Sequence, residues 1–216
     1  MTKKLNHFFF NAPYVHGNVV FNFLGQPVRD LRIFALAYHE TDRKLAAPMV
    51  SGTGYRDYDG YPIFFLYRHA LELYLKAIVY RGAMLVRLIT EDDLVTEKLF
   101  ARHDLTRLVP AIRIIFAKTG WSFVGSGLAS VEDFVVLVSE IDKIDAHSYA
   151  FRYPIKTSGE AHLPHHFVVN VVHFSQHMDR LLGFLDAVAS TVEEHWDIEA
   201  EVRFELQKLF ASSKES

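Results

Sequence analysis

An irregular stretch of the chain, residues 145–165, gathers side chains that could bind an anion. Its first part carries four of them: Asp145, His147, Arg152 and Tyr153. An Arg held in such a loop can bind a phosphate or a carboxylate through two parallel hydrogen bonds. The alternative is that Arg152 turns inward and pairs with Glu72, because a buried carboxylate needs a cationic partner. Both hold if the pair lines a cleft.

Three charged side chains recur at every fourth position within residues 61–81, the most apolar part of the chain: Arg68, Glu72 and Lys76. This spacing places them on one ridge of a helix. The ridge could be a solvated face with salt bridges along it. It could instead line a polar cleft, because a helix that is apolar nearly all round is usually buried. In that case Glu72 is ready to accept a further cation.

His103 and Asp104 are adjacent and could form a catalytic pair. Such a pair more often marks the start of a helix, with the Asp side chain capping the first N–H groups. We favour the helix start, with Asp104 as the cap.

A late group of histidines could bind zinc or nickel through imidazole nitrogens. His173 and His177 are spaced i,i+4, and His166 lies two turns earlier on the same predicted helical face. No Asp or Glu completes this stripe, and no Glu lies between the pair as in the metalloprotease motif. We therefore expect a polar helix face without a bound metal. The chain also has no cysteine and no sequence motif of a serine nucleophile or a phosphate-binding loop.

The elements that must position these residues are helices. Hydrophobic residues recur with helical spacing along most of the chain after residue 27, whereas the aromatic, β-branched residues 1–27 are typical of an extended segment or a hairpin. The sequence predicts an all-α antiparallel bundle of five to seven helices in one domain, residues 28–210, followed by a frayed tail at 211–216. The expected helices span residues 28–47, 61–81, 90–100, 105–118, 126 or 130 to 144, 166–188 and a last charged stretch to 209.

Several residues signal where these helices begin and end. We expect Pro48 to end the first helix and Gly82 to stop the central one. Pro110 is expected to kink its helix. Either Ser126 or Ser130 begins the helix before the irregular loop.

Composition limits the function classes. The 216 residues carry a net charge of −3, which gives no general attraction to nucleic acid, although a local basic patch is possible. The absence of cysteine excludes disulfides and thiolate chemistry, and it is compatible with a cytoplasmic protein. We see no signal peptide and no stretch that could span a membrane.

Three pieces in this order resemble the HEPN superfamily of small α-helical domains. The first is the segment from Arg68 through Glu72 to Lys76-Ala77, the second is His103-Asp104-Leu105, and the third is Arg152-Tyr153-Pro154. Together they cover about residues 61 to 155. The resemblance implies a helical core, a homodimer and a cleft that binds RNA or a nucleotide. Many members are metal-independent ribonucleases, and some are toxins paired with a nucleotidyltransferase antitoxin.

The resemblance also implies where the site lies. The cleft would be formed by Arg68, Glu72, His103 and Arg152, with Asp145 and Tyr153 beside it. For RNA cleavage, Arg152 would stabilise the phosphorane and His147 or His162 would act as acid and base, with no cofactor. The family's catalytic signature is an Arg followed by four to six residues and a His, whereas Thr, Ser and Gly occupy residues 157–159. The alternative is therefore a catalytically inert module that dimerises or binds a partner protein.

Overall fold

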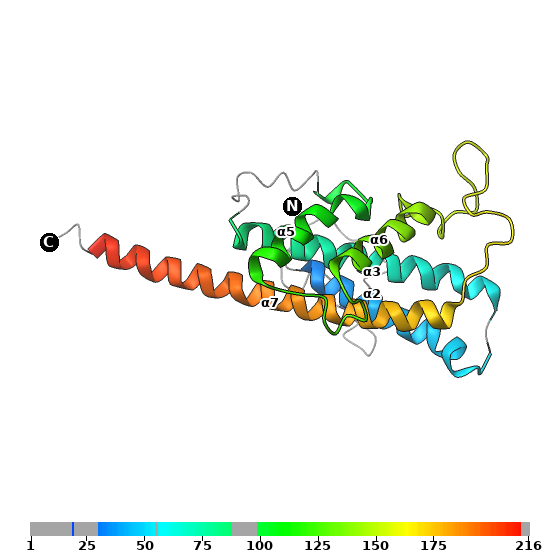
Figure 1. The fold of residues 1–216 in the computed structure, drawn as a ribbon, viewed down its shortest axis with the longest axis horizontal. Helices are drawn as coiled ribbons and strands as arrows, with labels where there is room; N and C mark the ends of the chain where they lie inside the picture. The colour runs from blue at the N-terminus through cyan, green and yellow to red at the C-terminus, as the bar shows by residue number, and fades with distance from the viewer. Residues whose placement is uncertain (1–18, 20–29, 55, 88–98, 213–216) are drawn as a thin grey trace, which may run out of the picture.

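The computed structural model describes residues 19, 30–54, 56–87 and 99–212, and the regular elements of these residues are all helices (Figure 1). The all-α prediction is therefore confirmed, and a single isolated bridge, Ile155 to Ala161, is the only β-pairing in the described residues. The extended segment predicted at 1–27 and most of the helix predicted at 90–100 lie outside them. The helices are α2 (Asp30–Ser51), α3 (Gly60–Leu85), α5 (Val109–Thr119), α6 (Val131–Asp145) and α7 (Val171–Ser212), with 3-10 turns η1 (Asp57–Asp59) and η2 (Leu105–Arg107).

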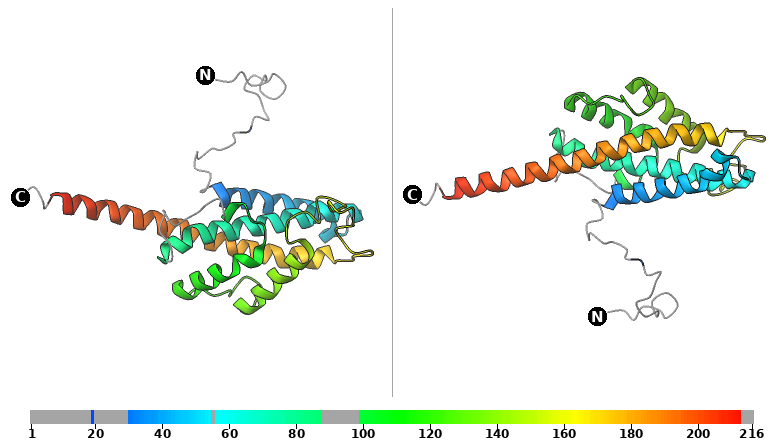
Figure 2. Two further views of the ribbon diagram at one scale, coloured as in Figure 1. Left: turned by 90° about the horizontal axis from the view of Figure 1, so that it is seen from above. Right: turned by 90° about the horizontal axis from the view of Figure 1, so that it is seen from below.

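Helices α2, α3 and α7 lie side by side, and α3 is central (Figure 2). α2 runs opposite to α3 and α7, which point in the same direction. The shorter α5 and α6 cover the side of this layer away from α2 (Figure 2). α7 has 42 residues, so it is about 60 Å long, and its C-terminal half projects beyond the other helices (Figure 1). Within the described ranges, every helix is too short or too polar for a transmembrane span.

The hydrophobic core surrounds α3, which is why this stretch is apolar on nearly every side. The fully buried side chains of α3 pack against apolar residues of α5 and of α7, such as Leu182 and Leu185. Each fully buried aliphatic or aromatic side chain contributes roughly 1.5–3 kcal/mol. The buried residues of α3 that form the core are Ile63, Tyr67, Ala70, Leu71, Tyr74, Leu75, Ala77 and Ile78.

Two predicted helix ends are wrong. Pro48 lies inside α2, which continues to Ser51, because Ala46 and Met49 are buried in the core and hold the last turn in place. Gly82 does not stop α3, which continues to Leu85. A Cβ atom at Gly82 would lie 3.0 Å from Ile115 Cδ1, so this glycine allows α5 to approach α3 closely.

Three predictions about the later helices also need correction. Pro110 occupies the first turn of α5, where its missing N–H needs no partner, so it does not kink the helix. The last two expected helices are one continuous helix that begins at Val171, not at residue 166. It includes residues 211 and 212 of the predicted tail, and 213–216 lie outside the described residues.

The start of α6 is decided between the two predicted serines. Ser130 is the N-cap, because its Oγ accepts a hydrogen bond from the Asp133 N–H at 3.2 Å and Asp133 Oδ2 accepts one from the Ser130 N–H at 3.1 Å. This reciprocal capping box is encoded locally. It fixes where α6 starts and therefore where its C-terminal end meets α3.

Candidate functional site

The charged ridge of α3 is buried. Arg68 and Glu72 are each 1% exposed and Lys76 is 3% exposed, so the prediction of a solvated face is wrong. Arg68 Nη1 donates to Glu72 Oε2 at 2.8 Å, and Lys76 Nζ donates to Glu72 Oε1 at 2.7 Å. The ridge is buried because residues 100–107 and the C-terminal end of α6 lie over it.

Arg68 is the centre of this interior network. Its Nε donates to the carbonyl oxygen of Asp145 at 2.9 Å, and its Nη2 donates to the carbonyl oxygen of His103 at 2.6 Å. Nη2 also lies 3.5 Å from the carbonyl oxygen of Ala146. The C-terminal end of a helix carries partial negative charge, so the end of α6 is a favourable place for a guanidinium group. Arg68 therefore joins three segments that are far apart in the sequence.

His103 is the partly exposed member of the network. Its Nδ1 lies 2.9 Å from Glu72 Oε1, and its side chain is 42% exposed. Burial alone would raise the pKa of Glu72, but hydrogen bonds and charge from Lys76 and Arg68 outweigh it and lower the pKa. The ionised carboxylate only accepts hydrogen bonds, so the His103 Nδ1 carries a proton and its Nε2 is left for a ligand.

A second pair of imidazole and carboxylate lies next to the first. His147 Nδ1 is 3.2 Å from Asp104 Oδ1, and Arg107 Nε is 2.8 Å from Asp104 Oδ2. The imidazole of His147 is exposed. The carbonyl of His103 and the carbonyl that precedes His147 both approach the same Arg68 nitrogen, so the two histidines come from adjacent backbone segments.

Asp104 does not cap the helix start as predicted. Its side chain makes no hydrogen bond to the N–H groups of η2. Asp142 of α6 does this instead, because its two carboxylate oxygens accept from the Leu105 and Thr106 N–H groups at 3.2 and 2.7 Å. The cap comes from another helix, which frees Asp104 to hold His147.

Arg152 lies beside this site but does not pair with Glu72, so that expectation is wrong. Glu72 is buried, and its partners are Arg68 and Lys76, one turn away on either side, and His103. The Nε of Arg152 donates to the carbonyl oxygen of Ser148 at 2.6 Å. Its guanidinium group lies over three aromatic rings, 5.3 Å from the centre of Phe65, 5.0 Å from Tyr149 and 5.6 Å from Tyr153.

Asp145 holds the loop from inside the protein. It is buried, and its Oδ1 accepts hydrogen bonds from the N–H groups of Tyr149 at 2.7 Å and Ala150 at 2.9 Å. Its carbonyl oxygen bonds Arg68, as described above. Tyr153 at the end of this loop is exposed. Asp145 therefore positions the loop, whereas Tyr153 can reach a ligand.

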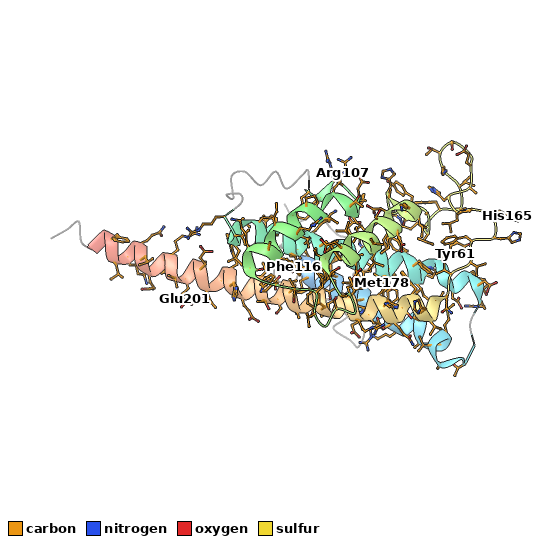
Figure 3. The ribbon with its side chains drawn as sticks, viewed as in Figure 1. Tyr61, Arg107, Phe116, His165, Met178 and Glu201 are labelled. Carbon is orange, nitrogen blue, oxygen red and sulfur yellow. The ribbon has the colours of Figure 1, made fainter. Side chains whose placement is uncertain are left out.

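His162 lies farther along, just after the bridge between Ile155 and Ala161. Its N–H donates to the carbonyl oxygen of Pro154 at 3.2 Å. Within the part of the chain that the structure describes, no hydrogen bond or ion pair joins its side chain to His147 or Arg152. Farther along the same loop, His165 lies beyond the ends of the helices (Figure 3).

The late histidines do not form the predicted stripe. His166 precedes α7 and has a positive φ of 57°, so it shares no helical face with His173 and His177. The rings of His173 and His177 are 4.4 Å apart, and partial burial together with the charge of His173 lowers the pKa of His177. No group of three or more side chains suited to a metal ion occurs among the described residues.

A buried acid that the sequence did not single out lies between α2 and α7. Asp42 is fully buried, and neither of its carboxylate oxygens has a hydrogen-bond partner. Burial, and then the charge of Asp179, raise the pKa of Asp42 to about 9. Asp179 itself accepts hydrogen bonds from Tyr67 Oη at 2.8 Å and pairs with His39 Nε2 at 3.0 Å. Only the packing of α2 against α3 and α7 brings these groups together.

Comparisons with protein families, with curated proteins and with solved structures found no match to this chain. The function of the site can therefore be inferred only from its own geometry.

Proposed function

We propose that the chain binds RNA and cleaves it without a metal ion, with His103 and His147 as the acid–base pair. One observation carries this proposal. Two histidines on adjacent backbone segments each have Nδ1 close to a carboxylate: His103 is hydrogen-bonded to Glu72 at 2.9 Å, and His147 lies within ion-pair distance of Asp104 at 3.2 Å. A carboxylate at Nδ1 orients the ring and leaves Nε2 to exchange protons with a substrate.

The reaction that suits two such imidazoles is transfer of the phosphodiester to the neighbouring 2′-oxygen. The neutral imidazole takes the proton of the 2′-OH at Nε2 while the 2′-oxygen attacks phosphorus. The protonated imidazole gives its Nε2 proton to the departing 5′-oxygen, so the P–O5′ bond breaks as the P–O2′ bond forms. The products are a 2′,3′-cyclic phosphate and a 5′-hydroxyl, and the two imidazoles have exchanged protonation states.

The cations of the site have separate roles in this proposal. Arg68 and Lys76 are buried, so they act as positioning residues that hold Glu72 and the backbone of His103. Arg152 is exposed and uses its Nε for Ser148, which leaves its two terminal nitrogens to face the phosphate. A guanidinium group can bind two phosphate oxygens at once and stabilise the charge of the phosphorane.

The test is cleavage of single-stranded RNA in EDTA by the purified chain. We expect 2′,3′-cyclic phosphate ends, and we expect His103→Ala and His147→Ala each to lower the rate at least ~100-fold. His173→Ala is the matched control, because His173 is exposed on α7 and should leave the rate unchanged. His162 was the other histidine that the sequence offered as acid or base. His162→Ala should also have little effect on the rate. Cleavage that survives the His103 and His147 substitutions, or that requires a divalent metal, would refute the proposal.

A second candidate function is a catalytically inert module that dimerises or binds a partner protein. The observation that favours it is the half of α7 that projects beyond the other helices (Figure 1). This half exposes Ile198, Val202, Phe204 and Leu206. Absence of RNA cleavage together with a stable dimer in sedimentation would favour this function over the first.

A further inference from the structure

Next to the two histidines, three aromatic rings gather around Arg152, and the proposed chemistry uses the arginine but not the rings. We call this group the aromatic platform: Phe65, Tyr149, Arg152 and Tyr153. The Arg152 guanidinium lies within 5.0–5.6 Å of the centres of all three rings. The two tyrosine rings are 6.0 Å apart and tilted by 54°.

The platform is held in place by the same buried residues that hold the histidines. Asp145 fixes the backbone of Tyr149 through its N–H group, and Arg68 fixes Asp145. Ser148 has a φ of 61°, a left-handed conformation that is strained for a serine, and its carbonyl oxygen fixes Arg152. The loop therefore loses little conformational freedom when a ligand binds, which favours affinity.

The platform is open to solvent although it is aromatic. Tyr149 is 45% exposed and Tyr153 is 54% exposed. Tyr149 lies two residues after His147, so the rings and this histidine belong to the same short loop. Exposed aromatic rings beside an arginine suit unpaired nucleobases, which stack on a ring while the cation attracts the phosphate backbone.

We infer that the aromatic platform binds unpaired bases, so the substrate of this site is single-stranded rather than duplex nucleic acid. The inference rests on the proposed function, since it names the form of RNA that the two histidines act on. Duplex RNA does not fit, because its bases stack on each other and present only their edges in the grooves. A flat ring face then has no base to cover it.

The experiment measures binding of labelled 12-nucleotide single strands and of a 12-base-pair RNA duplex to the full chain in EDTA, by fluorescence anisotropy. A single strand of DNA is included because it lacks the 2′-OH and cannot be cleaved by the proposed reaction. We expect both single strands to bind and the duplex to bind at least ~10-fold more weakly. Stacking contributions predict that the double variant Tyr149→Ala/Tyr153→Ala raises Kd for the single strands ~10-fold or more. The double variant Tyr149→Phe/Tyr153→Phe should keep Kd near the wild-type value, because the aromatic rings remain.

Phe204→Ala is the matched control. Phe204 is an exposed ring with a cation over it, Lys208 Nζ at 4.2 Å, but it lies on the projecting part of α7. Its substitution should leave Kd unchanged. Equal binding of duplex and single strand, no binding of any single strand, or no effect of the double tyrosine substitution would each overturn the inference.

Failure of the inference and failure of the proposed function give different results. Cleavage that needs both histidines but is indifferent to the two tyrosines would refute the platform alone. Binding of single strands through the tyrosines without any cleavage would refute the chemistry and support the platform.

Discussion

The Nη2 atom of Arg68 lies 2.6 Å from the carbonyl oxygen of His103, although 35 residues separate them in the sequence. The same guanidinium binds the carbonyl of Asp145 and the carboxylate of Glu72. One buried side chain therefore fixes the backbone at His103 and at the end of α6, just before His147. Loss of its geometry should affect both stability and the site.

Arg68→Lys keeps the charge but removes the planar arrangement of donors. A lysine cannot satisfy Glu72 and the two carbonyl oxygens together, so we expect the free energy of unfolding to fall by about 2–4 kcal/mol. Urea denaturation at pH 7 measures this change. Arg43→Lys on α2 is the control, because Arg43 is exposed and pairs at the surface with Glu40, and its variant should stay within about 0.5 kcal/mol of the wild type. A similar effect of both substitutions would contradict the central role of Arg68.

Glu72 should make the protein sensitive to acid. Its pKa is lowered in the folded state, so the folded protein binds a proton at this group less readily than the unfolded chain does. The resulting stability is fully present above the ordinary pKa of 4.5 and is lost as the pH falls through the lower folded-state pKa.

Glu72→Gln tests this contribution. At pH 7 the amide leaves Arg68 and Lys76 buried with no carboxylate, so we expect a loss of roughly 3–5 kcal/mol. The loss should shrink as the pH falls from 4.5 through the lower folded-state pKa, because the carboxylate of the unfolded wild-type chain and then that of the folded protein become neutral. Urea midpoints of both proteins between pH 3 and pH 7 give the comparison, and a difference independent of pH would show that Glu72 titrates as it does in the unfolded chain.

Asp42 should have the opposite dependence on pH. Its pKa is raised from 3.8 to about 9, first by burial and then by the charge of Asp179, so the folded protein keeps a proton that the unfolded chain releases. Stability from this group is therefore complete below pH 3.8 and decreases as the pH rises toward 9. At pH 7 the Asp42 carboxyl ionises when the chain unfolds, which favours unfolding. Asp42→Asn removes this carboxyl and should stabilise the protein at pH 7 by up to about 4 kcal/mol.

The gain from Asp42→Asn should nearly vanish at pH 4, which differential scanning calorimetry at both pH values can measure. Asp57→Asn is the control, because Asp57 is exposed in η1 and should show no such difference. A destabilised Asp42→Asn protein at pH 7 would mean that the carboxylate is ionised in the folded state.

Two helical glycines should respond to alanine in opposite ways. At Gly82 of α3 the new methyl would lie 3.0 and 3.1 Å from two carbon atoms of Ile115, so we expect a loss of about 1–3 kcal/mol from overpacking. At Gly183 of α7 a Cβ has no atom within 4 Å, so the higher helix propensity of alanine should add about 0.5–1 kcal/mol. Chemical denaturation of the two variants measures both effects. A stabilised Gly82→Ala protein would contradict the close approach of α3 and α5.

Local spacing was sufficient to predict the parts of this protein whose contacts lie within one helix. The i,i+4 repeat of Arg68, Glu72 and Lys76 predicted that these side chains contact one another, because helix geometry alone brings them together. Ser130 was one of two predicted starts of α6 for the same reason, since its capping partner lies three residues away. The apolar composition around these residues predicted the burial of α3 and the all-α class.

The tertiary structure alone decided which distant residues meet. His103, not Arg152, completes the set of Glu72 partners, and Asp142 caps the turn that Asp104 was expected to cap. Asp104 binds His147 instead. Such contacts depend on how α3, α6 and the segments between them pack, and the spacing of residues along the chain carries no information on the relative position of segments separated by 30 residues or more. For this reason the sequence predicted a helical protein with a charged ridge on its most apolar helix and left open whether that ridge faces solvent, whereas its burial and the carboxylate partners of the two histidines became visible only in the folded arrangement.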